Sequence, residues 1–362
     1  MIITIINFPI NLEKNSITSP CVLNNMDSIN IKKLAKELNL STSTISRAFR
    51  GSNEINKTTK ERVLSLAYEL NYTPNHHASN LREKKSNTIA VIVPEIANNF
   101  FSQAINGIER IAREKGYHIL IYLTYDDFEK ETSFIGNLQS GRVDGIIMSV
   151  SGEANNHDYL IKLQKKKIPL VFFDRVYDDI DTAKVTSNDY ESSFTATEHL
   201  INNGCKTIAY LVVNKTHSIG KMRMRGYIDA LAAHKLPYRD DLIIDCSNEL
   251  EKNIELLNQA FYELKPDGIF ASVERLALAS YQVCHDQHLK IPEDIKIISF
   301  SSLEIASLLN PSLSTITQPA LEMGIAAANL LFKAINSDDD QNINEQIVCK
   351  SVIIGRRSSG IL

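Results

Sequence analysis

The order of apolar and polar positions divides the chain into a short helical stretch and a long alternating one. Between residues 29 and 72, apolar residues recur at the three- and four-residue spacing of amphipathic helices. From Thr88 onward, short apolar runs alternate with amphipathic segments of helical length. Such alternation is typical of parallel sheets with helices packed on both faces. The pattern therefore predicts a multi-domain protein, with a small all-α domain followed by a doubly wound α/β core.

The first two predicted helices have the spacing of a helix-turn-helix. They run from about Ile31–Leu38 and Thr42–Arg50. Asn39 tolerates the left-handed backbone that a tight turn between them requires, and Ser41 can cap the second helix. A third helix is predicted to open with a capping box, Thr58–Glu61. This arrangement is typical of a DNA-reading domain.

Packing of the second helix through its apolar residues leaves a polar face outward. That face carries Thr42, Ser43, Ser46 and Arg47. The early residues of a recognition helix reach base edges in the major groove. An arginine there can bond guanine O6 and N7 together, which discriminates between bases by about 1–3 kcal/mol. We therefore predict that these four side chains contact DNA.

The charge distribution supports DNA contact at this end of the chain. The net charge is −4, but residues 26–87 hold 11 basic and 6 acidic side chains. Residues 88–362 hold 27 basic and 36 acidic side chains. Positive charge is thus concentrated where phosphate contacts would need it.

The first 25 residues are interpreted as an extension that is disordered or not native. They are apolar at the start, but lack the basic region and cleavage site of a signal peptide. Met26 stands directly before the helix-turn-helix, so we expect the functional chain to begin there. No apolar run reaches the ~18 residues that span a membrane. The five cysteines are scattered, without metal-site spacing. We expect a cytoplasmic protein without membrane contact, bound metal or cofactor.

Three successive segments resemble the N-terminal module of the lactose/galactose-repressor (LacI/GalR) family of bacterial regulators. They read LAKELNLSTSTISRAFRG, TKERVLSLAYELNYTPN and ASNLR. The resemblance continues through most of the chain and implies a periplasmic-binding-protein-like core of two subdomains. The implied parts are a helix-turn-helix domain over 26–73, a hinge helix over 74–87, and an effector-binding and dimerisation core over 88–362. Within the core, the N-subdomain is expected over about 88–186 and 318–338, and the C-subdomain over about 188–316 and 345–358.

By this resemblance, the segment from Pro74 is a hinge helix that contacts the minor groove. It is too short and polar to be stable alone, so we expect it to form when two copies meet on DNA. Leu81 matches a leucine that wedges into a base step and kinks the duplex; the alternative is an ordinary linker leucine. DNA contacts are expected from Asn75, His76, Ala78 and Leu81.

Ligands of such cores lie between the subdomains, beyond the carboxyl ends of the strands. Residues that follow predicted strands are therefore the candidates for effector contact: Phe100, Phe101, Asp174, Glu274 and Ser301. The resemblance adds Arg223, which matches the family's effector-binding arginine and could donate a bidentate pair. Crossovers between subdomains are expected near Thr186–Asn188, Ile316–Gln318 and Asp338–Asn344.

One departure from the family pattern bears on the effector. Ser301 stands where many members carry an aspartate that binds sugar hydroxyls. Loss of that carboxylate should weaken binding of neutral sugars and remove a negative charge. It therefore favours a sugar phosphate or sugar acid, anchored by Arg223.

These features predict a homodimeric, sequence-specific transcriptional regulator, expected to be a repressor. A two-fold symmetric dimer predicts a pseudo-palindromic double-stranded DNA operator, and the core predicts a sugar or sugar-derivative effector. A solute-binding protein with the same core is an alternative, but it leaves the basic module unexplained. A cytosolic enzyme is another, but no nucleophile–base set or phosphate loop stands out. We expect no enzymatic activity.

Overall fold

The computed structural model describes residues 30–49, 52, 54–72, 85–139, 141–152, 156–337 and 344–360. The chain divides into two compact units, residues 1–79 and 80–362. The predictions for the first 25 residues, for the start at Met26 and for the hinge residues Asn75, His76, Ala78 and Leu81 lie outside the described residues.

The first unit contains the predicted three helices. They are α1 (Ile31–Leu38), α2 (Thr42–Phe49) and α3 (Lys57–Glu69). Asn39 has a positive φ of 53°, and the Ser41 hydroxyl accepts the Thr44 N–H at 3.1 Å, as the turn and cap require. The three helices share one small core: Leu34, Ala35, Ile45, Ala48, Val63 and Ala67. This core fixes which face of α2 points outward.

The start of α3 corrects the predicted capping box. The side chain of Asn56 accepts the Thr59 N–H at 2.7 Å, and the helix begins at Lys57. Thr58 therefore lies inside the first turn, where its hydroxyl cannot act as the N-cap. Asparagine caps at least as well as threonine, and Asn56 comes first along the chain.

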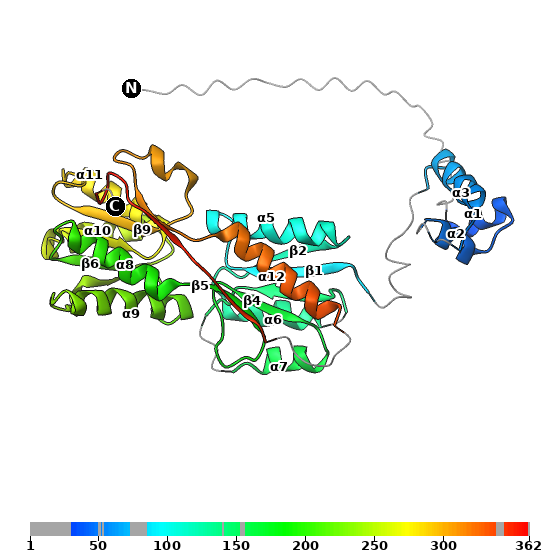
Figure 1. Ribbon diagram of the computed structural model, residues 1–362, viewed down its shortest axis with the longest axis horizontal. Coiled ribbons are helices and arrows are strands. Elements are labelled where there is room, and N and C mark those ends of the chain that lie inside the picture. Colours follow the sequence, from blue (N-terminus) through cyan, green and yellow to red (C-terminus); the bar gives the residue numbers. More distant parts are fainter. Residues whose placement is uncertain are drawn as a thin grey trace, which may run out of the picture. The chain divides into compact units, whose positions relative to one another are not determined.

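The second unit contains two six-stranded sheets (Figure 1). The first sheet has the order β11-β5-β4-β3-β1-β2, and all of its pairings are parallel. Its strands are β1 (Thr88–Val93), β2 (His118–Leu123), β3 (Gly145–Met148), β4 (Leu170–Phe173), β5 (Ala183–Ser187) and β11 (Gln346–Cys349). Helices cover both faces, with α5 (Asn99–Glu114) and α12 (Ala320–Ile335) on one and α6 (Phe128–Leu138) and α7 (Asp158–Lys165) on the other.

The second sheet repeats this plan with the order β12-β10-β9-β8-β6-β7. Its strands are β6 (Ile208–Val212), β7 (Ile243–Asp245), β8 (Gly268–Ala271), β9 (Lys296–Phe300), β10 (Ser314–Thr317) and β12 (Val352–Ile354). Its covering helices are α8 (Asp189–Asn202) and α9 (Ser218–Ala233) on one face, and α10 (Leu250–Leu264) and α11 (Glu274–Asp286) on the other. Only β12 runs antiparallel to its neighbour in this sheet.

The apolar runs of the core predict eight strands, and all eight are confirmed: Thr88–Pro94, His118–Thr124, Gly145–Val150, Leu170–Asp174, Thr207–Val213, Leu242–Cys246, Gly268–Val273 and Lys296–Ser301. The four that were not expected are β5, β10, β11 and β12. They are the strands at or next to the points where the chain changes sheet. β5 and β10 carry polar residues on one face. β11 and β12 are short and are separated by the polar Lys350 and Ser351, so neither forms a long apolar run.

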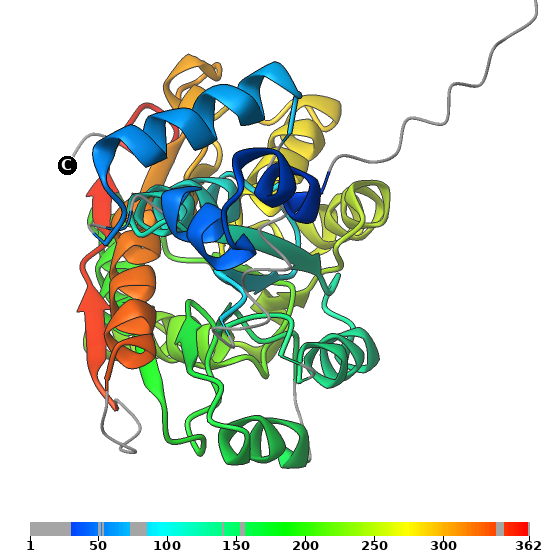
Figure 2. The ribbon, with the colours of Figure 1, turned by 90° about the vertical axis from the view of Figure 1, so that its right-hand side faces the viewer.

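The chain passes between the two sheets three times. It crosses from β5 to α8 at Asn188 and from β10 to α12 at Gln318–Pro319. The third expected crossover, at Asp338–Asn344, is wrong. The segment after α12 returns to the first sheet as β11, and only Lys350 and Ser351 separate β11 from β12 in the second sheet. Residues 345–349 thus belong with the first sheet, because they pair with β5. Figure 2 shows this segment in red beside the orange α12.

Candidate effector cleft and DNA-reading helix

The outward face of α2 carries the side chains that the sequence predicts to read DNA. Thr42 and Arg47 are exposed, whereas Ser43 and Ser46 are half-buried. Arg47 Nη1 lies 3.3 Å from a carboxylate oxygen of Glu54, and both side chains are more than half exposed. An ion pair in that setting contributes little, so the guanidinium can exchange this partner for another at small cost.

In the core, the carboxyl ends of the strands in the two sheets face each other across a cleft. All six residues predicted for effector contact line one cavity there, together with Asn98, Arg175, Ile219, Ser272, Val273, Phe300, Ser302 and Gln318. The cavity volume is about 40 Å³. Small-molecule sites usually measure roughly 300–1,000 Å³. The structure therefore shows the cleft closed too tightly for a sugar.

Arg223 is the buried centre of this site, with 3% of its surface exposed. Its Nε donates to Asp189 Oδ1 at 2.6 Å, and its Nη1 donates to the carbonyl of Ser272 at 2.7 Å. The guanidinium carbon also lies 3.7 Å from the ring centre of Phe300. We call Arg223, Asp189 and Ser272 the cleft floor. Two of the three guanidinium nitrogens are already bonded within the protein, which limits the bidentate grip on a ligand that the resemblance implies.

Close packing of two helices places Arg223 beside Asp189. A Cβ on Gly226 would lie 2.4 Å from the carbonyl oxygen of Tyr190, so only glycine allows α9 to approach α8 this closely. Asp189 is the first residue of α8, and Arg223 lies one turn before Gly226 on α9. The ion pair is therefore set by backbone packing rather than by side-chain flexibility.

The environment of Ser301 corrects the expectation of an anionic effector. Its hydroxyl donates to Glu274 Oε2 at 2.9 Å. Glu274 begins α11 and supplies a carboxylate at the place where Ser301 lacks one. The cleft has therefore not lost its acceptor, and Arg223 is already paired with a carboxylate. The serine at position 301 therefore does not by itself favour a sugar phosphate or sugar acid.

Asp174 lies at the end of β4 in a left-handed conformation, with φ of 62°, and is 4% exposed. Burial raises its pKa to about 6, although the nearby Arg175 and Arg223 act in the opposite direction. Near neutral pH this carboxyl can both accept a hydrogen bond and, when protonated, donate one. Either form suits a hydroxyl-bearing ligand.

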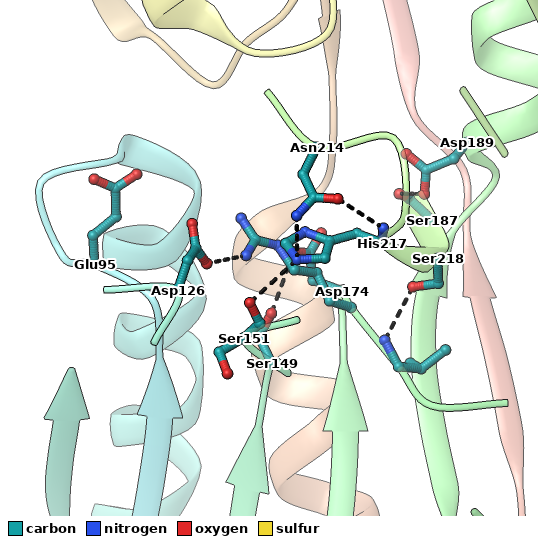
Figure 3. A network of polar contacts seen from close by, with 12 residues as sticks. Glu95, Asp126, Ser149, Ser151, Asp174, Ser187, Asp189, Asn214, His217 and Ser218 are labelled. Carbon is teal, nitrogen blue, oxygen red and sulfur yellow. Dashed lines mark hydrogen bonds and ion pairs between the residues drawn. The ribbon is translucent and has the colours of Figure 1, made fainter. Parts of the chain in front are cut away.

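Several polar contacts join the two subdomains at the other side of the cleft. Arg275 on α11 forms an ion pair with Glu95, which follows β1, and both side chains are 26% exposed. Asn248 Nδ2 donates to Asp126 Oδ2 at 3.3 Å, and Asp126 also pairs with Arg175. We call Glu95, Arg275, Asn248 and Asp126 the cleft mouth. Figure 3 shows Glu95 and Asp126 at one side of the network and Asp189 at the other.

His217 contacts the opposite subdomain near the middle of this network (Figure 3). Its Nε2 lies 3.2 Å from the carbonyl oxygen of Ser151 and 3.0 Å from Asn214 Nδ2. The Ser151 carbonyl can only accept a hydrogen bond, so it needs a proton on Nε2. The Asn214 amide nitrogen can only donate, so it needs a lone pair on Nε2. A neutral ring can satisfy only one of these two partners. Burial, helped by Arg175, lowers the pKa of His217 to about 4. The ring is neutral at pH 7, and this bond between subdomains is easily given up.

Sequence reasoning missed several residues of the cleft: Asn98, Asp126, Asp189, His217, Ser272 and Gln318. Most of them follow a strand, as the predicted residues do, and Asp189 and Gln318 lie at the predicted crossovers. The predicted crossovers could therefore have indicated Asp189 and Gln318. Nothing local in the sequence indicates that Asp189 pairs with a residue 34 positions later.

Comparison with known families assigns both parts of the chain. Residues 30–75 match the family described as bacterial regulatory proteins, lacI family. Residues 86–353 match periplasmic binding proteins and the sugar-binding domain of the LacI family. The chain belongs to the LacI family. It is a DNA-binding transcriptional regulator with a ligand-binding core.

Relatives of similar length support this membership. Catabolite control protein A of Priestia megaterium is 30% identical over 313 residues, covering 86% of this LacI-family chain and 94% of that protein. The HTH-type transcriptional regulator DegA of Bacillus subtilis is 31% identical over 297 residues, covering 81% and 88%. Both relatives are named as regulators rather than enzymes.

Solved structures show the same fold. The lac repressor dimer bound to operator and the anti-inducer ONPF matches with a TM-score of 0.80 at 20% identity, covering 92% of this chain and 99% of that one. A LacI-family regulator from Enterococcus faecium with bound ribose matches with a TM-score of 0.67 at 26% identity, covering 76% and 99%. In the part of the chain that the structure describes, no helix is long and apolar enough to cross a membrane.

Proposed function

We propose that this regulator is a cytoplasmic repressor that binds a pseudo-palindromic operator as a homodimer and responds to a neutral sugar in the cleft. The observation that carries the proposal is that one chain combines two parts. The outward face of α2 presents Thr42 and Arg47, and the core holds five candidate ligand contacts around the buried Arg223. The chain thus has one surface suited to DNA and one cavity suited to a small molecule.

The choice of a neutral effector rests on the charges of the cleft. Asp174 and Glu274 provide carboxylates, while the charge of Arg223 is balanced by Asp189. Carboxylate oxygens accept hydrogen bonds from sugar hydroxyls, whereas they repel a phosphate. The rings of Phe100 and Phe101 also line the cavity and can pack on the apolar face of a sugar.

The closed cleft explains how the effector would change DNA affinity. A sugar needs more space than the 40 Å³ of the closed cavity, so its entry requires the subdomains to separate at the cleft mouth. The ligand then favours one arrangement of the subdomains, and that preference is coupled to the DNA-binding domains.

Selection from genomic DNA with the full-length protein tests the DNA part. We expect an enriched pseudo-palindrome. The variant Arg47→Ala should lose about 1–3 kcal/mol of binding free energy at the guanine it contacts and relax specificity there. Arg62→Ala on α3, an exposed cation of the same domain, is the control and should keep the motif. Retention without a motif that fades in moderate salt would contradict specific reading.

Calorimetry against matched neutral and anionic sugars tests the effector part. We expect a neutral pentose or hexose to bind, and Glu274→Gln to weaken it. Glu293→Gln, in an exposed loop of the same subdomain, is the control. Binding of only a sugar phosphate or sugar acid would overturn the neutral assignment and leave the DNA assignment untouched.

A further inference from the structure

A second and much larger cavity lies on the crossover side of the core. Its volume is about 610 Å³, within the range of small-molecule sites. It shares only Asp174 and Ile219 with the closed effector cavity. Its walls come from both subdomains: β5, β11 and the loop after β4 on one side, and the first turns of α8 and α9 on the other.

The floor of this cavity is formed by two neighbouring strands of the first sheet, β5 and β11. Lys184 and Thr186 of β5 and Gln346 and Val348 of β11 are paired in register and line the cavity together. Val348 is 60% exposed, which is unusual for a valine on a sheet face. The cavity thus offers an apolar surface next to polar groups.

Lys184 is the distinctive residue of this floor. It is 7% exposed, and its Nζ donates to the backbone carbonyl of Asp178 at 3.0 Å. No carboxylate among the described residues lies within ion-pair distance of this ammonium. An anion that enters the cavity would supply this ammonium with the opposite charge that the protein does not provide.

The opposite wall also favours an anion. Helix α9 has 16 residues, with no acidic residue in its first turn and no side-chain cap at His217. Ser218 and Ile219 of its first turn line the cavity, as does the exposed Lys221. The N-terminus of a helix carries partial positive charge and free N–H groups.

The acidic residues that line the cavity do not cancel this preference. Asp189 is occupied by Arg223 at 2.6 Å, and Asp174 lies on the side of this cavity that it shares with the effector cavity. Asp178 and Glu191 are exposed, so solvent and salt screen their charges. The preference for an anion therefore rests on Lys184 and the N-terminus of α9.

We propose that this cavity is a second ligand site that takes a small organic anion with a carboxylate or phosphate head at Lys184 and an apolar body against Val348 and Met222. Met222 reaches the cavity from α9 and is 49% exposed. Such a ligand contacts both subdomains on the side of the crossovers. It therefore provides a second small-molecule input to the same movement, independent of the sugar cleft.

Calorimetry of the full-length protein with phenyl phosphate, and separately with benzoate, tests this site. We expect at least one probe to bind, and Lys184→Met to weaken it roughly tenfold or more through loss of a charged hydrogen bond. Lys165→Met removes the same charge from the exposed face of α7 and should leave binding unchanged. A preference between the two probes distinguishes a phosphate head from a carboxylate.

A second variant protects the test against a folding failure at Lys184. Val348→Trp places a large side chain at an exposed position of the floor and should block binding without disturbing a buried core. Equal binding by wild type and Val348→Trp, or by wild type and a folded Lys184→Met, would place the anion elsewhere and overturn the proposal. The absence of a binding heat with both probes up to about 10 mM would also overturn the proposal. A Kd of 1 mM already corresponds to only about 4 kcal/mol of binding free energy, so a weaker site would not be a specific one.

Discussion

The floor and the mouth of the effector cleft both hold an arginine–carboxylate pair, but the two pairs differ in burial and in what they join. Arg223 and Asp189 at the floor are 4% and 5% exposed and belong to one subdomain. Arg275 and Glu95 at the mouth are each 26% exposed and come from different subdomains. A buried pair within one body is a fixed part of the site, whereas a half-exposed pair between two bodies can open. The cleft thus combines a permanent anchor with a removable closure.

The largest loss of stability is expected when one partner of the buried pair at the cleft floor is removed. Asp189→Ala leaves the Arg223 guanidinium buried without its counter-charge, which should cost about 3–5 kcal/mol of unfolding free energy. Urea unfolding of the core measures it. Asp241→Ala, which breaks the exposed pair with Arg239, is the control and should leave the midpoint unchanged. Equal effects of the two variants would mean that burial does not distinguish the floor.

The next largest effect is expected in the pH dependence of stability, to which the buried Asp174 contributes. Its folded pKa is raised from 3.8 to about 6, so between these values the native state binds more protons than the unfolded state. This carboxyl therefore makes the protein less stable as pH rises from about 4 to 6, with no further change above. In Asp174→Asn that loss is absent, and the variant should gain about 3 kcal/mol relative to wild type across this window. Urea midpoints at a series of pH values measure it; parallel curves would contradict the raised pKa.

His217 should act in the opposite direction over a similar window. Its folded pKa is lowered from 6.5 to about 4, so the unfolded chain takes up a proton first as pH falls. Stability contributed by the neutral ring is present above pH 6.5 and is lost on acidification toward pH 4. His217→Gln should remove this loss, worth about 3 kcal/mol. His285→Gln, an exposed histidine on α11, is the control. A wild-type slope that survives in His217→Gln would assign it to another group.

The smallest expected effect is at the mouth. Glu95→Gln removes a half-exposed pair, so unfolding free energy should change by less than about 1 kcal/mol. The closed cleft should open more often, and sugar association should accelerate by a few-fold in stopped-flow measurements. High salt should do the same to wild type. Glu109→Gln, which breaks a pair within α5, should have no effect on association. An unchanged association rate in Glu95→Gln would show that this pair does not close the cleft.

The sequence indicates most of the architecture, because strands buried between helices must be apolar on both faces. It does not indicate strands such as β11, which has only four residues, begins with Gln346 and lies at an edge of its sheet. The run from Gln346 to Ile354 contains no glycine or proline, so nothing in it marks the change of sheet at Lys350 and Ser351. That crossover depends on which distant strand each half pairs with.

In the candidate site too, the sequence indicates the positions of residues but not their contacts. Positions after strands identify Asp174, Glu274 and Ser301, because topology alone brings strand ends together. What each residue does there depends on its partner. The carboxylate of Glu274 compensates for Ser301 through a contact between residues 27 positions apart, and the pairing of Arg223 depends on glycine-mediated packing of two helices. Local sequence patterns contain no record of such contacts.

The short connection between β11 and β12 limits how the cleft can move. Cys349 and Val352 are three residues apart, so a fully extended chain separates their Cα atoms by no more than about 11 Å. Both ends are held by hydrogen bonds in their own sheets. The two subdomains therefore cannot move apart at this connection, and the distance between Cys349 and Val352 stays nearly constant. Any opening must be a swing or twist about this tether, with displacement that grows with distance from it and is greatest at the side remote from the crossovers.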